Sequence, residues 1–163
     1  LGPPDDPATI SQSKGAVEAL TRISGAQAPF VSRGDDSGTH KKELQIWERA
    51  GVEPKGAWYI ESGQGMGACL TMADDQMAYV LADRGTYLAM VDKLELILVF
   101  EGDTELVNPY SIIAVSPEKY SDVNHAGAKR LIDWITTPEA QQLIADYRVN
   151  GYQLFHPVEE AEQ

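Results

Sequence analysis

Residues 30–40, with the sequence FVSRGDDSGTH, predict a short strand, a tight polar loop and the first turn of a helix. Two glycines in this stretch permit backbone angles that other residues resist. Asp36 and Ser37 are residue types that favour the N-cap of the helical run that follows. Because the start of a helix offers unpaired N–H groups and a partial positive charge, this loop is suited to an anion.

The same loop carries side chains that donate hydrogen bonds. Arg33 supplies a positive charge and a planar donor fork, and hydroxyl groups come from Ser32, Ser37 and Thr39. From these residues alone, an anion site and an ordinary strand-to-helix turn with a solvated arginine are equally good interpretations. His40 is interpreted as a packing or capping residue of the first turn, because no nucleophile motif accompanies it.

Two amphipathic helices are predicted on either side of this strand. The first carries apolar residues at helical spacing over residues 17–23 and is expected to end at Gly25. The second follows the loop and is expected to bury a stripe formed by His40, Leu44 and Trp47.

The plan of strand, glycine-containing loop and helix recurs twice downstream. Residues 57–60 predict a strand that leads into ESGQGMG at 61–67, with Ser62 as a polar group, and then into a helix. The G-x-G-x-G spacing differs from the dinucleotide pattern G-x-G-x-x-G, so a nucleotide site is only weakly supported. A third unit combines a strand at 77–81 with a helix whose predicted N-cap is Asp83.

The rest of the chain extends an α/β pattern. Alternating strands and helices imply a mainly parallel sheet flanked by helices, and the ligands of such sheets collect at the carboxyl ends of the strands. The strand predicted at 111–115 is expected to be buried on both faces. The other predicted elements are strands at 94–100 and 152–155, a helix at 126–135 and a helix that begins at Pro138 and is ended by Gly151.

Composition narrows the classes of function. The chain has 163 residues, of which 43% are apolar and 23% charged, enough to bury a core. A net charge of −12 argues against nucleic acid or an anionic membrane as a partner. The single cysteine, Cys69, rules out an internal disulfide and a cysteine metal cluster, and it is expected to be buried. The histidines at 40, 125 and 156 lack metal-ligand spacing, so neither a metal nor a cofactor is expected.

Three motifs resemble the tungstate-binding component of bacterial ABC transporters. They are SRGDDSGTHKKE at 32–43, WYIESGQGMG at 58–67 and ADRGTY at 82–87, and the likeness runs from Gly2 to about Pro157. The resemblance implies the two-lobed fold of type II periplasmic binding proteins, with an oxyanion held between the lobes. It implies tungstate as the ligand, with molybdate or another tetrahedral oxyanion as the close alternative.

The same resemblance implies a protein that is not an enzyme, works with a membrane permease and lies in the periplasm or outside the cytoplasm. A phosphate-handling enzyme domain is the alternative from a different class. In the family scheme Arg33 is the oxyanion-binding arginine. The other residues expected to contact the ligand are Ser32, Ser37, Gly38, Thr39, Ser62 and Gly65.

The resemblance also divides the chain. Residues 8–100 correspond to the second lobe, residues 101–110 cross back, residues 111–157 belong to the C-terminal part of the first lobe, and residues 158–163 form an acidic tail. The family's first lobe carries a ligand loop upstream of a Gly-Pro-x-x-Asp-Pro hinge, and this chain begins at that hinge. We therefore expect a fragment with an incomplete two-lobe architecture, weakened oxyanion binding, and self-association or segment exchange through uncovered apolar segments.

Overall fold

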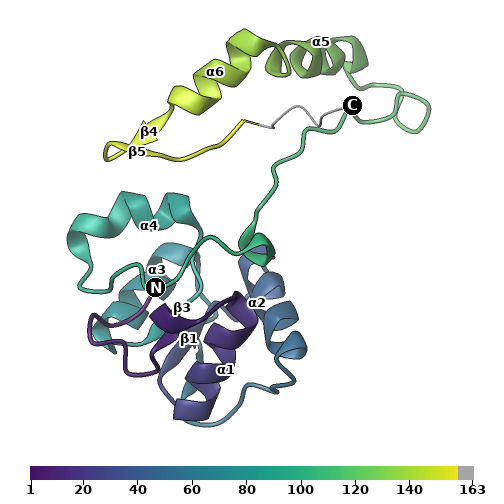
Figure 1. Ribbon diagram of the computed structural model, residues 1–163. Helices are drawn as coiled ribbons and strands as arrows, with labels where there is room; N and C mark the ends of the chain where they lie inside the picture. Colours follow the sequence, from purple (N-terminus) through teal and green to yellow (C-terminus); the bar gives the residue numbers. More distant parts are fainter. Residues whose placement is uncertain (158–163) are drawn as a thin grey trace. The chain divides into compact units, whose positions relative to one another are not determined.

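The computed structural model describes residues 1–157, so the acidic tail expected at 158–163 lies outside the described residues. Contacts within the chain divide it into two compact units, Leu1–Val107 and Asn108–Gln163 (Figure 1). Among the described residues, no helix is both long enough and apolar enough to cross a membrane.

The first unit is built on a three-stranded parallel sheet in the order β2-β1-β3. Its strands are β1 (Phe30–Ser32), β2 (Tyr59–Glu61) and β3 (Tyr79–Val80). Phe30 of the central strand pairs with the first residue of each neighbour. Because all three strands run the same way, their carboxyl ends meet at one edge of the sheet, as the alternating pattern predicts.

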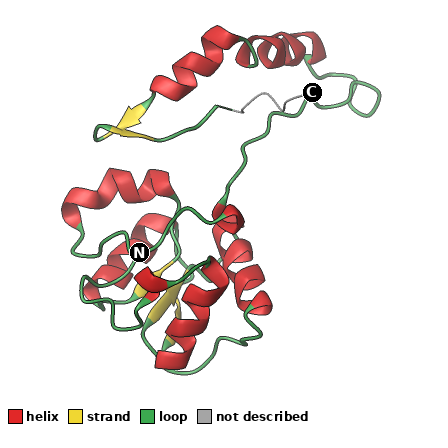
Figure 2. Ribbon diagram, viewed as in Figure 1, coloured by secondary structure: helices red, strands yellow, loops and turns green. Residues whose placement is uncertain are grey.

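Helices cover both faces of this sheet, and Figure 2 shows the strands enclosed by them. Side chains of a strand alternate between its faces. Phe30 therefore packs into one apolar cluster with Ile46 and Trp47, whereas Val31 packs into a second cluster with Cys69 and Leu70. The helices of the unit are η1 (Ile10–Gln12), α1 (Ala16–Ala26), α2 (Gly38–Arg49), α3 (Met66–Asp75), α4 (Arg84–Met90), η2 (Val91–Lys93) and η3 (Thr104–Leu106).

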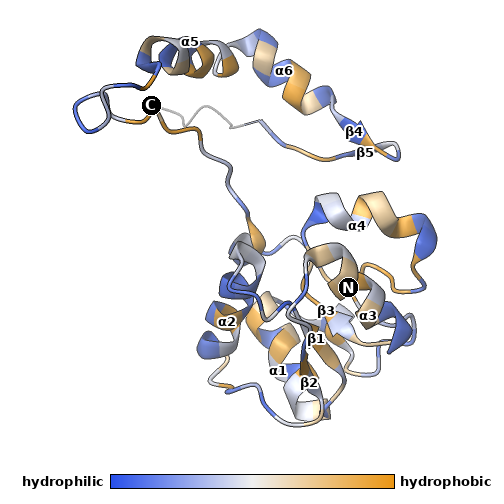
Figure 3. Cartoon of the chain, turned by 180° about the vertical axis from the view of Figure 1, so that it is seen from behind, coloured by the Kyte–Doolittle hydropathy of each residue, from blue (hydrophilic) through white to orange (hydrophobic). Residues whose placement is uncertain are grey.

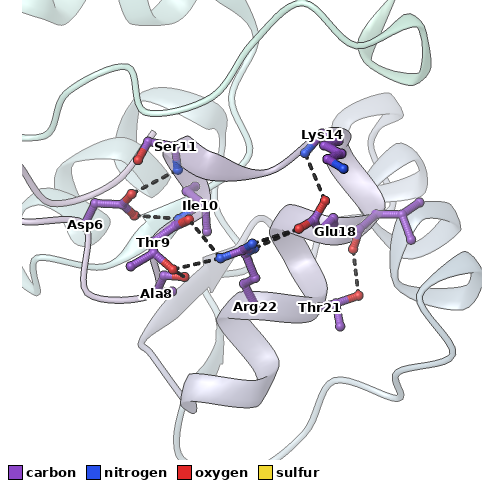
Figure 4. Close-up of polar contacts among 10 residues, drawn as sticks. Asp6, Ala8, Thr9, Ile10, Ser11, Lys14, Glu18, Thr21 and Arg22 are labelled. Atoms are coloured by element: carbon purple, nitrogen blue, oxygen red, sulfur yellow. Dashed lines mark hydrogen bonds and ion pairs between the residues drawn. The ribbon is translucent and has the colours of Figure 1, made fainter.

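Polar contacts tie the start of the chain to α1 (Figure 4). The Asp6 carboxylate accepts hydrogen bonds from the N–H groups of Ile10, at 3.0 Å, and Ser11, at 2.9 Å, and so caps η1. Arg22 of α1 donates to the Thr9 hydroxyl at 3.0 Å and to Glu18 at 2.8 Å. These contacts hold the proline-rich entry segment against the helix layer.

Two details of the predicted helices are wrong. Helix α1 runs through Gly25 and ends at Ala26, and the next residue, Gln27, has a φ of 52° and so supplies the left-handed turn that was expected of the glycine. Helix α2 does not bury the predicted stripe, since Leu44 is 42% exposed. Its buried residues are Glu43, Ile46 and Trp47, so the inward face includes a carboxylate.

Two predicted strands are also absent. In residues 94–100 only Ile97 forms a β-bridge, which is antiparallel to Gly2. The other residues of this segment pair with no described strand. Residues 111–115 are not strand and pair with no described strand, and Ile113 is 84% exposed instead of buried. Apolar content predicts burial, but a strand also needs a partner backbone to accept its hydrogen bonds.

The described part of the second unit contains α5 (His125–Ile135), α6 (Pro138–Asp146) and a hairpin of β4 (Arg148–Val149) with β5 (Tyr152–Gln153). Both helices were predicted, but α6 ends before Gly151, which lies beyond β4 with a φ of 81°. Apolar and polar segments alternate along α5 and α6 (Figure 3). Trp134, Leu143 and Phe155 are among the residues that line an apolar groove of about 270 Å³ within this unit.

Candidate functional site

Two long helices begin at the carboxyl edge of the three-stranded sheet. Helix α2 starts at Gly38, shortly after β1 ends at Ser32, and α3 starts at Met66, shortly after β2 ends at Glu61. Strands β1 and β2 are parallel neighbours, so the two helix starts lie beside one another at that edge. Each start presents backbone N–H groups and the positive end of a helix dipole.

Local residues shape the first loop. Ser37 is the N-cap of α2, and its hydroxyl accepts a hydrogen bond from the His40 N–H at 3.3 Å. The His40 Nδ1 accepts from the Asp36 N–H at 3.1 Å, which confirms the capping interpretation of this histidine. Gly34 has a φ of 60°, and a Cβ placed there would lie 2.9 Å from the Glu61 Cβ. The loop therefore requires glycine at this position.

Arg33 is not solvated. Its side chain is 18% exposed and donates to the Asp35 carboxylate at 2.5 Å. The Arg33 Nε is buried and has no hydrogen-bond partner among the described residues. Asp35 also accepts from the Ser37 N–H at 3.2 Å. The Ser37 hydroxyl has the largest effect and lowers the pKa of Asp35; desolvation comes second and opposes it, and the Ser37 N–H and the Arg33 guanidinium add to the lowering, which brings the pKa to about 2.

Ser62 joins the second loop to the first. Its hydroxyl donates to the Arg33 carbonyl oxygen at 3.1 Å and accepts from the Gln64 N–H at 3.2 Å. The Ser62 N–H also donates to the Ser32 carbonyl oxygen at 2.9 Å. The residues at the ends of β1 and β2 are therefore held together through backbone and side chain.

Each of these helix starts carries a glycine that no other segment covers. A Cβ placed on Gly38 or on Gly65 would meet no described atom within 4 Å beyond its chain neighbours and the backbone of its own helix. Gly65 is the N-cap of α3, and no described side chain caps that helix by a hydrogen bond. Thr39 lies in the first turn of α2. The Ser37 hydroxyl takes the His40 N–H at the start of α2, whereas the start of α3 has no capping side chain among the described residues and so offers uncapped N–H groups to an anion.

The third loop is organised differently. Asp83 caps α4 by accepting from the Thr86 N–H at 2.8 Å, which confirms the predicted N-cap. Arg84 donates to Glu101 at 2.6 Å on the surface. With the Asp83 carboxylate bound to the first turn of α4 and Arg84 paired with Glu101, this loop favours an anion less than the second loop, whose helix start no described side chain caps.

A buried carboxylate that the sequence analysis missed lies beneath the first loop. Glu43 of α2 is 1% exposed and accepts hydrogen bonds from Ser32, at 2.8 Å, from Trp47, at 3.1 Å, and from Tyr59, at 2.8 Å. Burial raises the pKa of Glu43, although these three donors oppose the shift. The available signal was its position next to Ile46 and Trp47 on the inward face of the helix.

The structure thus brings together most of the residues that the sequence marked. Ser32, Arg33 and Ser62 are linked by hydrogen bonds, and Ser37 reaches Arg33 through Asp35. The Ser32 hydroxyl is committed to Glu43, so it is not a free donor in this arrangement. No group of His, Cys, Asp and Glu among residues 1–157 is arranged to hold a metal ion. The arrangement is chemically suited to holding an anion by neutral donors and one guanidinium.

A family model described as the PBP superfamily domain matches residues 1–139, and the chain belongs to this superfamily. The chain is 46% identical over 154 residues to the tungstate-binding protein TupA of Peptoclostridium acidaminophilum, an alignment that covers 93% of this chain and 54% of that protein. It spans about half of the length of the curated relatives that it matches. The resemblance to tungstate-binding components is thereby confirmed.

Solved structures agree with this assignment. The crystal structure of the tungstate ABC transporter from Geobacter sulfurreducens is matched with a TM-score of 0.79 and 51% identity, over 90% of this chain and 62% of that one. The tungstate-binding protein TupA from Desulfovibrio alaskensis G20 is matched with a TM-score of 0.86 and 37% identity, over 98% of this chain and 66% of that one. The predicted fold class, a PBP-like α/β fold with a parallel sheet, is confirmed.

Proposed function

We propose that the protein captures a tetrahedral oxyanion, with tungstate as the first candidate and molybdate as the close competitor, for import by an ABC transporter. The observation that carries this proposal is the position of Arg33. Arg33 directly follows β1, at the sheet edge from which α2 and α3 start, and its guanidinium donates to the partly exposed Asp35 carboxylate. A mobile dianion can compete with such a partner.

The proposed contacts follow from the donor chemistry. Arg33 gives charge-assisted hydrogen bonds, each contributing about 1.5–3 kcal/mol. Thr39 is a hydroxyl donor, and Ser37 and Ser62 join it only if their protons turn away from Asp35 and from the Arg33 carbonyl oxygen. Gly38 and Gly65 leave room for an oxyanion beside the two helix starts. Ser32 joins them only if its proton turns away from Glu43. Selectivity among oxyanions is expected to follow from the size of the space between these donors and from the number of donors.

The proposal extends to partners and location. The relatives are named as tungstate-binding proteins and as a tungstate ABC transporter, not as enzymes. On that basis we place the protein outside the cytoplasm, in contact with a membrane permease, and assign it no catalytic activity. Self-association of the chain through the exposed apolar residues of the second unit stays a prediction.

Calorimetric titration of the full-length protein with tungstate, molybdate, sulfate and phosphate tests the proposal. Replacing Arg33 by Gln is expected to weaken tungstate binding about 10- to 100-fold, because the charge-assisted bonds are lost. The matched control is Arg84→Gln, which removes a surface arginine of the third loop whose partner is Glu101. Unchanged affinity in Arg33→Gln, or a preference for phosphate over tungstate, would overturn the proposal.

A further inference from the structure

Glu43 and Ser32 form a buried pair directly beneath the proposed oxyanion site. The Ser32 hydroxyl is the last side chain of β1 and donates to the Glu43 Oε2 at 2.8 Å. Both residues are almost completely buried. An ionised carboxylate in such a place is costly unless hydrogen bonds or a counter-charge compensate it.

The two oxygens of Glu43 have different partners. Oε1 accepts from the Trp47 Nε1, at 3.1 Å, and from the Tyr59 hydroxyl, at 2.8 Å. An indole N–H can only donate, so Oε1 must stay an acceptor. Oε2 faces Ser32, whose hydroxyl can either donate or accept. A proton bound to Glu43 therefore belongs on Oε2, between Glu43 and Ser32.

Protonation reverses the direction of this hydrogen bond. With Glu43 ionised, the single Ser32 proton points at Oε2, and only lone pairs of Ser32 remain for any other neighbour. These lone pairs would repel an oxyanion. With Glu43 protonated, Oε2–H donates to the Ser32 oxygen, and the Ser32 proton is released to donate to an oxyanion oxygen.

We propose that Glu43 is a positioning residue that couples oxyanion capture to the uptake of one proton from solvent, by turning the Ser32 hydroxyl from an acceptor into a donor toward the ligand. The inference rests on the proposed function, with Ser32 as one of the ligand donors. The bond that forms is the O–H bond at the Glu43 Oε2, with a proton given up by a solvent or buffer acid, and no other covalent bond changes. The proton taken up resides on Glu43 in the bound state and is returned to solvent on release.

The surroundings of Glu43 support a proton there. Desolvation raises the pKa of Glu43 despite its three donors, and His40 on the same helix opposes the shift only weakly. The other ionisable groups that face this region include Tyr59 and Glu61 of β2, Cys69 of α3, and Arg33 and Asp35 of the first loop. From α1, Glu18 and Arg22 pair with each other at 2.8 Å.

The test is a calorimetric titration of the full-length protein with dilute tungstate at a series of pH values, in two buffers with different enthalpies of ionisation. The wild type is expected to take up a proton on binding and to lose about tenfold in affinity as the pH rises through the pKa of Glu43. In Glu43→Gln the amide oxygen can accept from Trp47 and Tyr59 while the NH₂ group donates to Ser32. This variant is expected to bind tungstate at every pH with the affinity that the wild type has at low pH. It is expected to take up no proton on binding.

Two further variants complete the test. Ser32→Ala is expected to bind weakly at every pH with no proton uptake, because the donor itself is gone. Glu48→Gln removes an exposed carboxylate of the same helix and is expected to behave as the wild type. If Glu43→Gln fails to fold, as checked by thermal unfolding, the pH profile of Ser32→Ala decides the question.

The outcomes separate the two proposals. If the wild type binds tungstate but Glu43→Gln or Ser32→Ala keeps its pH dependence and its proton uptake, the proton coupling is wrong and oxyanion capture stands. If the wild type binds with no proton uptake at any pH, the coupling is likewise wrong. If the wild type binds no oxyanion, both proposals fall.

Discussion

The guanidinium of Arg33 lies 2.5 Å from the carboxylate of Asp35, two residues further along the same loop. Asp35 also accepts from the Ser37 N–H, at the start of α2. A carboxylate of the chain thus occupies two of the donors that an oxyanion would use. The loop carries an internal competitor for its proposed ligand.

Asp35→Asn is accordingly expected to raise oxyanion affinity several-fold. The amide removes the negative charge next to Arg33 and leaves the guanidinium available to the ligand. Calorimetry on the full-length protein measures the change. The control is Asp36→Asn, since Asp36 is exposed and pairs only loosely with Lys41, at 3.4 Å. A loss of affinity in Asp35→Asn would show instead that Asp35 holds Arg33 in its binding orientation.

Stability should depend on pH through Glu43. Its pKa is raised in the folded protein, so the folded state binds this proton more tightly than the unfolded state. The resulting stabilisation is present below the pKa of an unfolded glutamate and is lost as the pH rises through the folded pKa. Glu43→Gln lacks this titration. The difference in free energy of unfolding between Glu43→Gln and the wild type should therefore grow with pH over that range, as measured by urea denaturation.

The titration of Asp35 is expected to make the folded protein more stable as the pH rises, which is the opposite of the effect of Glu43. Its pKa is lowered to about 2, so its stabilisation is present at neutral pH and is lost as the pH falls below the unfolded value and toward 2. The pKa of Asp35 is shifted downward in the folded protein, whereas that of Glu43 is shifted upward. A stability difference between Glu43→Gln and the wild type that stays constant with pH would mean that Glu43 titrates normally.

Gly34→Ala is expected to destabilise the first unit by about 1–2 kcal/mol. Gly34 has a φ of 60°, and the added Cβ would lie 2.9 Å from the Glu61 Cβ. The loop would have to shift, so weaker oxyanion binding is expected as well. Thermal and urea unfolding measure the first effect, and calorimetry measures the second.

Gly25→Ala is the matched control for that experiment. Gly25 lies inside α1, and an added Cβ would meet no described atom within 4 Å. Alanine favours the helix over glycine by up to about 1 kcal/mol, so this variant should be more stable than the wild type. Equal effects of the two substitutions would contradict the strain assigned to Gly34.

Self-association of the chain is predicted from the second unit. Trp134 and Leu143 line its apolar groove and are exposed, and exposed apolar patches of this kind favour association. Sedimentation of the chain should show oligomers, and Leu143→Gln should shift the distribution toward monomer. Leu44→Gln on α2 is the control, because that exposed leucine stands outside the groove. A monodisperse monomer would contradict the prediction.

Much of the fold could be read from local patterns. The N-caps at Ser37 and Asp83, the alternation of short strands with helices, and the buried Cys69 depend on near neighbours in the chain. The division into lobes at residues 8–100, 101–110 and 111–157 stays a prediction. The division into compact units falls after Val107.

Other features depended on groups distant in sequence. Residues 94–100 and 111–115 have the apolar content of strands, but among the described residues only Ile97 finds a pairing partner. Glu43 resembled any polar helix residue, and its burial follows from Ser32 and Tyr59 on two neighbouring strands. The sequence pattern shows which residues are apolar. Strand pairing and burial depend in addition on backbone and side-chain contacts from segments that are distant in the sequence.

The sequence by itself determined that residues 30–40 form a strand, a polar loop and a capped helix start, because capping and glycine geometry are local properties. Only the tertiary structure decided how the donors of that loop are used. It pairs Arg33 with Asp35, commits the Ser32 hydroxyl to the buried Glu43, and sets Ser62 of the second loop against the first. The physical reason is that the parallel pairing of β1 with β2 brings the two loops to one edge.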